Sequence, residues 1–228
     1  KPLHLEPRAA RLLKSSSFSA ARRPASIAGP EAGSVSFLPI LALHEAMGFE
    51  KGIRRGSVWD DVIAIDAIVK KTRFALTGKS EREFEFAFTQ TLAAHSDRLK
   101  GKIFSQTDQD TVVKSVYCFG KRHRPDLTIN EDGIAIEIKY LSDSLDGIKL
   151  ALGQSMLYRL RYKFVFNVFI LAEKHKDTYA KASKGEERDL EDIFKDLSDE
   201  ANVFSYIVPA FSAAPNLKSC IECNGLGL

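Results

Sequence analysis

The sequence predicts an α/β protein in which a central mixed β-sheet is flanked by helices. Two observations support this fold class. From Ser80 onward, amphipathic segments with apolar residues three and four apart alternate with short apolar segments, in the order helix, three strands, helix, strand, helix, strand. Residues 163–173 are apolar at almost every position, as expected of a strand that is covered on both faces of a sheet.

The composition is that of a globular protein with room for a substantial core. The chain has 228 residues, of which 44% are hydrophobic and 28% are charged, and its net charge is +3. We expect no membrane partner, because no window has the run of about 18 apolar residues that a spanning helix needs. Three cysteines, Cys118, Cys220 and Cys223, are too few for a disulfide framework and indicate a cytoplasmic location.

Three regions are predicted along the chain. Residues 1–75 read as a basic arm with short helices at 38–49 and 57–72, because Ser, Ala, Pro and Arg dominate the first 36 residues without a sustained period. Residues 76–212 form the predicted core, and residues 213–228 form a C-terminal tail.

The core elements follow from local patterns. A helix starts at Ser80, where Ser and Glu83 make a capping box. A turn at 130–133 is expected to need a positive φ at Gly133. The other expected helices are 143–162 and 186–200, and the expected strands are 111–119, 125–129, 133–140, 163–173 and 203–211.

The strand at 133–140 carries two opposite charges on one face. Side chains alternate between the faces of a sheet, so Glu137 and Lys139 share a side that Ile136 and Ile138 do not. Buried charge is costly unless it is paired or bound to a metal. Asp126 lies on the preceding strand, and a short hairpin brings it near Glu137.

Two carboxylates and a lysine suit metal-assisted hydrolysis of a phosphodiester. Carboxylate oxygens are the ligands that Mg²⁺ prefers, and Mg²⁺ polarises phosphate oxygens and lowers the pKa of bound water. A neighbouring lysine can orient or deprotonate the attacking water and offset developing charge.

These residues resemble a known signature. Pro125-Asp126, ten intervening residues and Glu137-Ile138-Lys139 are similar to the PD-(D/E)xK motif of restriction-endonuclease-like nucleases, and the element order from Ser80 also resembles their core. The resemblance implies a restriction-endonuclease-like core with an N-terminal helical and irregular extension. It implies Mg²⁺, with Mn²⁺ as a substitute, bound by Asp126, Glu137 and the carbonyl of Ile138, while Lys139 positions the water.

Nucleases of this kind often place a further acid on the first core helix. Glu81, Glu83 and Glu85 are the candidates here. We prefer Glu85, as a catalytic residue and metal ligand, because about three turns of helix follow it before the chain reverses. Glu81 is close behind it.

Gln154 and Tyr158 lie four residues apart on one helical face. They resemble the Q-x-x-x-Y element of the RecB/Cas4-like exonuclease branch, which implies a place beside the active site and a contact with nucleic acid. Iron–sulfur members of that branch need four cysteines, so the three cysteines argue against a complete cluster within this chain.

A basic segment directly precedes the motif. Its residues, Lys121, Arg122, His123 and Arg124, are expected to contact phosphates without reading sequence. The sequence therefore predicts a Mg²⁺-dependent nuclease or endonuclease acting on DNA. Two alternatives stay open: a binding or assembly module that has lost catalysis, and an RNA-directed nuclease. Endonuclease against exonuclease action, the recognition sequence and assembly into a homodimer or larger complex are also open.

Overall fold

The computed structural model describes residues 54–74, 80–105, 113–212 and 220–222. They all belong to one unit of the chain, Ile40–Leu228. The strands are β1 (Ile103–Ser105), β2 (Val116–Cys118), β3 (Lys121–His123), β4 (Leu127–Ile129), β5 (Ile134–Leu141), β6 (Phe164–Leu171), β7 (Val203–Pro209) and β8 (Ile221–Glu222). The α-helices are α2 (Ser57–Lys71), α3 (Glu81–Ala94), α4 (Asp146–Tyr158), α5 (Lys176–Ser183) and α6 (Arg188–Ala201), and short 3₁₀ turns occupy Ser96–Arg98 and Glu173–His175.

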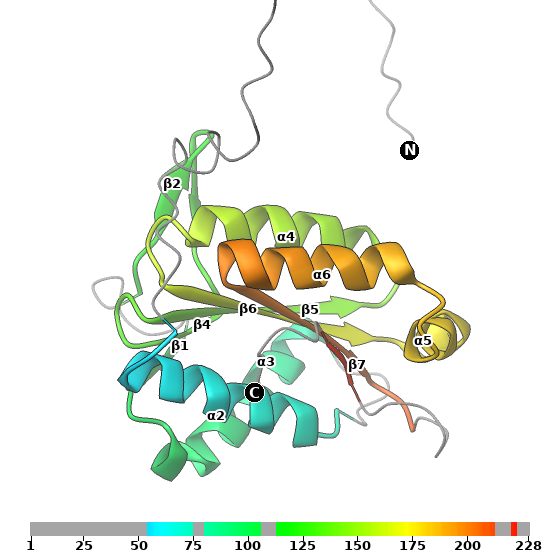
Figure 1. The fold of residues 1–228 in the computed structure, drawn as a ribbon, viewed down its shortest axis with the longest axis horizontal. Coiled ribbons are helices and arrows are strands. Elements are labelled where there is room, and N and C mark those ends of the chain that lie inside the picture. The colour runs from blue at the N-terminus through cyan, green and yellow to red at the C-terminus, as the bar shows by residue number, and fades with distance from the viewer. Residues whose placement is uncertain (1–53, 75–79, 106–112, 213–219, 223–228) are drawn as a thin grey trace, which may run out of the picture. The chain divides into compact units, whose positions relative to one another are not determined.

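The predicted α/β class with a mixed central sheet is confirmed. Within the described residues, six strands form one sheet in the order β1-β4-β5-β6-β7-β8. The pairs β5–β6 and β6–β7 are parallel, and the pairs β1–β4, β4–β5 and β7–β8 are antiparallel. Helices α4 and α6 lie on one side of this sheet, and α2 and α3 lie on the other (Figure 1).

The central strands are buried on both faces because helices cover each side. All eight residues of β6 are buried, as its apolar run predicts. On the α2 side, the Trp59 ring lies 5.6 Å from that of Phe164, between centroids, so the predicted helix at 57–72 shares its core with the sheet. The predicted helix at 38–49 lies outside the described residues.

Helix ends follow the local signals where these are strong. Ser80 and Glu83 form the predicted capping box, in which the Ser80 amide donates to Glu83 Oε2 at 2.8 Å. Helix α6 ends at Asn202, whose left-handed φ of 54° is a frequent helix stop. Helix α5 was not predicted from the sequence, although Tyr179 and Ala182, which are buried and three residues apart, were a signal for it.

The expectation of a sheet strand at 111–119 is wrong. Residues 113–118 contribute only β2, which pairs with β3 in a separate two-stranded hairpin, and residues 111–112 lie outside the described part. The apolar residues of this segment suggested a buried strand, but Tyr117 and Phe119 face solvent. The place of that strand in the sheet is taken by β1, three half-buried residues with little sequence signal.

The turn between β4 and β5 also differs from the prediction. Asn130, with φ of 58°, takes the left-handed position, and Gly133 is not among the residues with positive φ. Gly133 is required for another reason: a Cβ there would lie 2.5 Å from the Ile129 carbonyl oxygen. Glycine thus serves a close backbone approach here.

Part of the predicted C-terminal tail extends the sheet, since β8 pairs with β7. Among the described helices, none has the length and apolar character to cross a membrane.

Candidate active site

The candidate site lies at the N-terminal end of β4, where β5 continues without its partner strand. The antiparallel pairing of these strands stops at Leu127 and Ile136, so residues 137–141 of β5 extend past the end of β4. Two carboxylates take the place of the missing strand. The Ile138 amide donates to Asp126 Oδ2 at 2.7 Å, and the Tyr140 amide donates to Glu81 Oε2 at 3.0 Å. The end of a short strand therefore creates an edge lined by acids.

Asp126 and Glu137 converge, as the motif predicts. One further step of the strand register places them opposite each other, and opposite side chains share a face of the sheet. Glu137 is only 2% exposed. Burial raises the pKa of Asp126 to about 7, and the nearby Glu137 carboxylate adds to this rise. Asp126 is half-buried, and its charge and that of the buried Glu137 repel each other; a cation would relieve that repulsion.

The carboxyl of Glu137 is held by neighbours that favour its charged form. Burial raises its pKa, and the ammonium of Lys139 and the hydroxyl of Tyr158 oppose that rise. Lys139 Nζ lies 3.0 Å from Glu137 Oε1, and the Tyr158 hydroxyl donates to Glu137 Oε2 at 3.0 Å. Both oxygens of this carboxylate therefore have fixed directions.

Lys139 bridges two acids from different elements. Its Nζ contacts Glu137 and also lies 3.1 Å from Glu81 Oε1. Burial lowers the pKa of Lys139, but the surrounding carboxylates outweigh it, and the net pKa is raised above that of free lysine. The side chain is thus an ammonium near neutral pH, which favours positioning and charge neutralisation over removal of a proton.

Both helix acids favoured by the sequence lie near this cluster. Glu81 reaches Lys139 and the backbone of Tyr140 directly. Glu85 is half-buried one turn later; burial raises its pKa, and the charge of Asp126 raises it further. The structure brings both acids to the same cluster, and the preference for Glu85 as the completing acid stays a prediction. Glu83 is used in the helix cap instead.

Helix α4 brings Tyr158 to the acids. This side chain is fully buried, and its hydroxyl contacts Glu137 rather than solvent. Gln154 lies one turn earlier on the helix. Its side-chain oxygen is buried and has no hydrogen-bond partner within the part of the chain that the structure describes.

Three polar residues near the acids, Asn167, Ser155 and Ser205, were not predicted from the sequence. Asn167 lies opposite Glu137 in the β5–β6 register, and its side-chain oxygen accepts a hydrogen bond of 2.7 Å from the Ser155 hydroxyl of α4. Asn167 also donates to Ser205 on β7 at 3.2 Å. A signal existed, because Asn167 interrupts the otherwise apolar run of β6. These bonds fix α4, and with it Tyr158, over the sheet.

The basic segment leads directly into the site. Lys121 and Arg122 are exposed on β3, and His123 and Arg124 are half-buried before Pro125. A ring nitrogen of His123 hydrogen-bonds the Cys118 carbonyl oxygen at 3.3 Å, so this side chain braces the hairpin. The phosphate contacts expected of these four residues stay a prediction.

The donor set fits Mg²⁺ better than a metal that needs a complete protein cage. Within the described ranges, no three His, Cys, Asp or Glu side chains form a metal-binding group. Mg²⁺ is commonly held by one or two carboxylates and keeps several waters. Asp126 and Glu137 meet this need. The Ile138 amide donates to Asp126. The backbone N–H and C=O of one strand residue point to the same edge of the strand, so the Ile138 carbonyl faces the same edge as its amide. Cys223 lies outside the described residues, Cys118 is a free thiol, and the Cys220 thiol donates to the Ile221 carbonyl oxygen at 3.6 Å.

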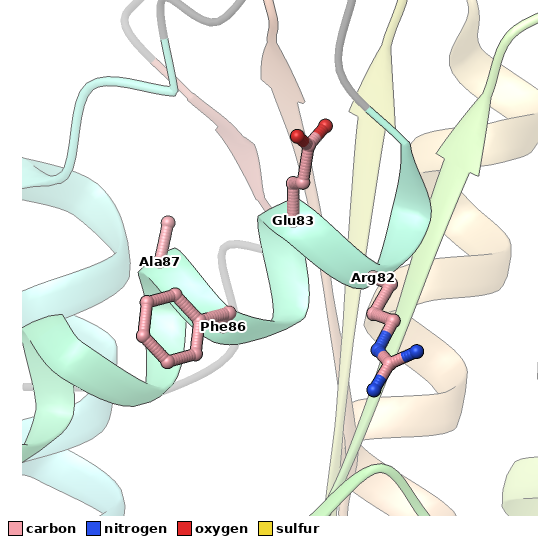
Figure 2. A pocket seen from close by; sticks show the side chains of 4 residues that line it. All are labelled: Arg82, Glu83, Phe86 and Ala87. Carbon is pink, nitrogen blue, oxygen red and sulfur yellow. The ribbon is translucent and has the colours of Figure 1, made fainter.

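A shallow hollow on α3 is separate from these acids. It is lined by Arg82, Glu83, Phe86 and Ala87, and Figure 2 shows the Arg82 guanidinium and the Glu83 carboxylate pointing in opposite directions. At 100° per residue these side chains project from the helix away from Glu81 and Glu85. The hollow therefore does not belong to the acid cluster.

Comparisons of the chain with protein-family models, curated proteins and solved structures found no match.

Proposed function

We propose that this protein is a metal-dependent nuclease that hydrolyses DNA phosphodiester bonds and that its core is restriction-endonuclease-like. One observation carries the proposal: two carboxylates, the half-buried Asp126 and the buried Glu137, face each other beside a lysine at an open strand edge. An acid pair withdrawn from water in this way lowers stability unless a cation joins it, so a binding role explains why it is present.

The order of elements supports the fold assignment. Helix α3, the strands β1, β4 and β5, helix α4 and strand β6 come in this order along the chain, with the β2–β3 hairpin inserted between β1 and β4, and without that hairpin the order is the one expected from the resemblance to restriction-endonuclease-like nucleases. The motif residues lie at the end of β4 and in the middle of β5, on the edge that α3 and α4 both approach.

Each side chain has a role in this proposal. Asp126, Glu137 and the Ile138 carbonyl would hold Mg²⁺, or Mn²⁺ in its place. When bound, the ion polarises a phosphate oxygen and lowers the pKa of water. Lys139, kept protonated by its acid neighbours, orients the attacking water and neutralises charge that develops on the phosphate. Tyr158 fixes the orientation of Glu137.

A cleavage assay tests the proposal. Wild type and Lys139→Ala are incubated with supercoiled, linear and single-stranded DNA, and with RNA in parallel, in Mg²⁺, Mn²⁺ or EDTA. Lys149→Ala is the matched control, because Lys149 also contacts an acid, Asp146 at 3.0 Å, but is 84% exposed on the outside of α4.

We expect metal-dependent DNA cleavage by wild type and by Lys149→Ala and its loss in Lys139→Ala. Cleavage of RNA alone would replace the DNA assignment with the RNA-directed alternative. Salt-sensitive DNA binding without cleavage by wild type, in any metal, would refute the enzyme and support the binding module.

A further inference from the structure

The β2–β3 hairpin presents aromatic side chains to solvent for no structural reason within the described fold. Phe119 is 89% exposed and Tyr117 is 76% exposed. The hairpin lies outside the main sheet and projects beyond the end of α4 (Figure 1). Its other face is anchored, because Val116 is buried against Tyr158 and Tyr162 in a small cluster. The base of the hairpin is therefore packed against the core, and its tip is exposed to solvent.

The turn at the tip holds phenylalanine in an unfavourable backbone conformation. Cys118 pairs with Lys121, which leaves Phe119 and Gly120 as a two-residue turn with φ of 50° and 70°. Such turns prefer Asn-Gly, since a bulky residue is strained at positive φ. Neither burial nor backbone conformation explains why a phenylalanine occupies position 119. A strained, exposed side chain of this kind points to a functional contact.

The surroundings of the two aromatic residues are basic. Residues 113–124 contain Lys114, Lys121, Arg122 and Arg124 and no Asp or Glu. Tyr117 and Arg122 are directly opposite each other in the hairpin register, so their side chains share its outer face. Aromatic rings beside cations suit a strand of nucleic acid whose bases are free to stack, while the cations meet its phosphates.

The hairpin is also tethered close to the candidate site. Only Arg124 and Pro125 separate β3 from Asp126. The seven residue-to-residue steps from Phe119 to Asp126 span at most about 25 Å, the length of a short stretch of single-stranded DNA. A strand held on the tip can therefore reach the acids.

From these observations we infer that the β2–β3 hairpin binds single-stranded DNA by stacking Tyr117 and Phe119 on unpaired bases and so selects substrates with a single-stranded region. The inference rests on the proposed function, because it names the form of DNA which that site takes. A blunt duplex offers phosphates but no free base faces. It would engage the cations alone.

Binding in EDTA tests the hairpin without cleavage. The anisotropy of a fluorescein-labelled oligothymidylate and of a blunt duplex is measured with wild type, Phe119→Asn and Tyr117→Thr. Phe119→Asn suits the turn better than the native residue, and Tyr117→Thr keeps a strand-favouring side chain, so neither is expected to unfold the hairpin. Phe86→Asn is the matched control, since Phe86 is a 66% exposed phenylalanine on α3.

We expect each hairpin variant to weaken the Kd for oligothymidylate by roughly tenfold, within the range found for one base stacked on an aromatic ring. The Kd for the duplex should change by less than about twofold, because the phosphate contacts remain. Phe86→Asn should match wild type on both ligands.

Three results would overturn the inference: oligothymidylate binding unchanged in both variants, equal weakening for the single strand and the duplex, or weakening confined to an oligouridylate tested in parallel. Dissociation of a wild-type dimer by Phe119→Asn, seen by light scattering, would instead make the tip a contact between copies of the chain. Metal-dependent cleavage of supercoiled DNA by wild type is measured alongside. Failure there refutes the proposed function, whereas failure of the binding test refutes the hairpin alone.

Discussion

Replacing Asp126 by asparagine should stabilise the metal-free protein. Burial and the Glu137 charge raise the pKa of Asp126 from 3.8 to about 7. Because the folded-state pKa is the higher one, the folded protein holds the proton more tightly than the unfolded chain. The free energy of unfolding of the wild type therefore falls as pH rises from about 4 to about 7 and stays low above that. Asparagine carries no charge at any of these pH values.

The size of the effect follows from the same shift. At 1.36 kcal/mol per pKa unit, the rise of about three units sets a ceiling of about 4 kcal/mol at pH 8. Asp126 shares its electrostatic penalty with Glu137, so we expect about half of this, roughly 2 kcal/mol, or about 4–8 °C in Tm for a chain of this size. Near pH 5 the gain should be less than half as large, because the wild-type group is then mostly protonated in the folded state.

The assay is urea denaturation in EDTA at about pH 5 and about pH 8. Asparagine can still accept the Ile138 hydrogen bond through its side-chain oxygen. Asp143→Asn is the control, because Asp143 is 94% exposed and burial does not strain its charge. If Asp126→Asn is less stable than wild type by the same amount at both pH values, the reasoning is refuted. Asp126 would then stabilise the fold through its hydrogen bond from the Ile138 amide, without an electrostatic penalty.

Three further predictions concern the same molecule. Tyr158→Phe should weaken Mn²⁺ binding, measured by calorimetry, by about tenfold or more because Glu137 loses the hydroxyl that orients it, and an unchanged affinity would contradict that role. The affinity of the wild type for Mn²⁺ should rise by up to about tenfold per pH unit below about pH 7 and level off above it, because a proton must leave Asp126 before the ion binds. Calorimetry in buffers of different ionisation enthalpy measures the released proton. If no proton is released on binding, this link between Asp126 and Mn²⁺ is refuted. Asp61→Ala should lower the free energy of unfolding by about 2–4 kcal/mol in urea, because the buried carboxylate accepts two backbone amides ahead of β1, and a loss below about 0.5 kcal/mol would show that water replaces it.

The sequence was informative where a pattern repeats over several residues. Alternation along 133–140 placed Glu137 and Lys139 on one face, and the apolar run of β6 predicted a strand covered on both sides. These patterns suffice for the fold class and for the acid pair, because the period of a strand fixes which side chains share a face.

Features that depend on a single tertiary contact were not predictable. Because β4 starts only at Leu127, the edge of β5 beyond it is left open, and Glu81 fills this edge. The helix pattern alone does not distinguish Glu81 from Glu85, because the choice depends on how α3 packs against β5. The close approach at Gly133 likewise depends on the path of the neighbouring backbone. At 111–119, the apolar residues suggested burial, but Phe119 faces solvent because it lies in the turn of a hairpin that is separate from the main sheet.

Mn²⁺ titration by calorimetry at about pH 8 tests most directly whether Asp126 and Glu137 form one cation site. We expect wild type and Asp143→Asn to bind one ion per chain at this site and Asp126→Asn and Glu137→Gln to lose that binding, while Asp126→Asn remains folded and more stable in EDTA. Equal binding by all four proteins, or no binding by wild type, would contradict the claim.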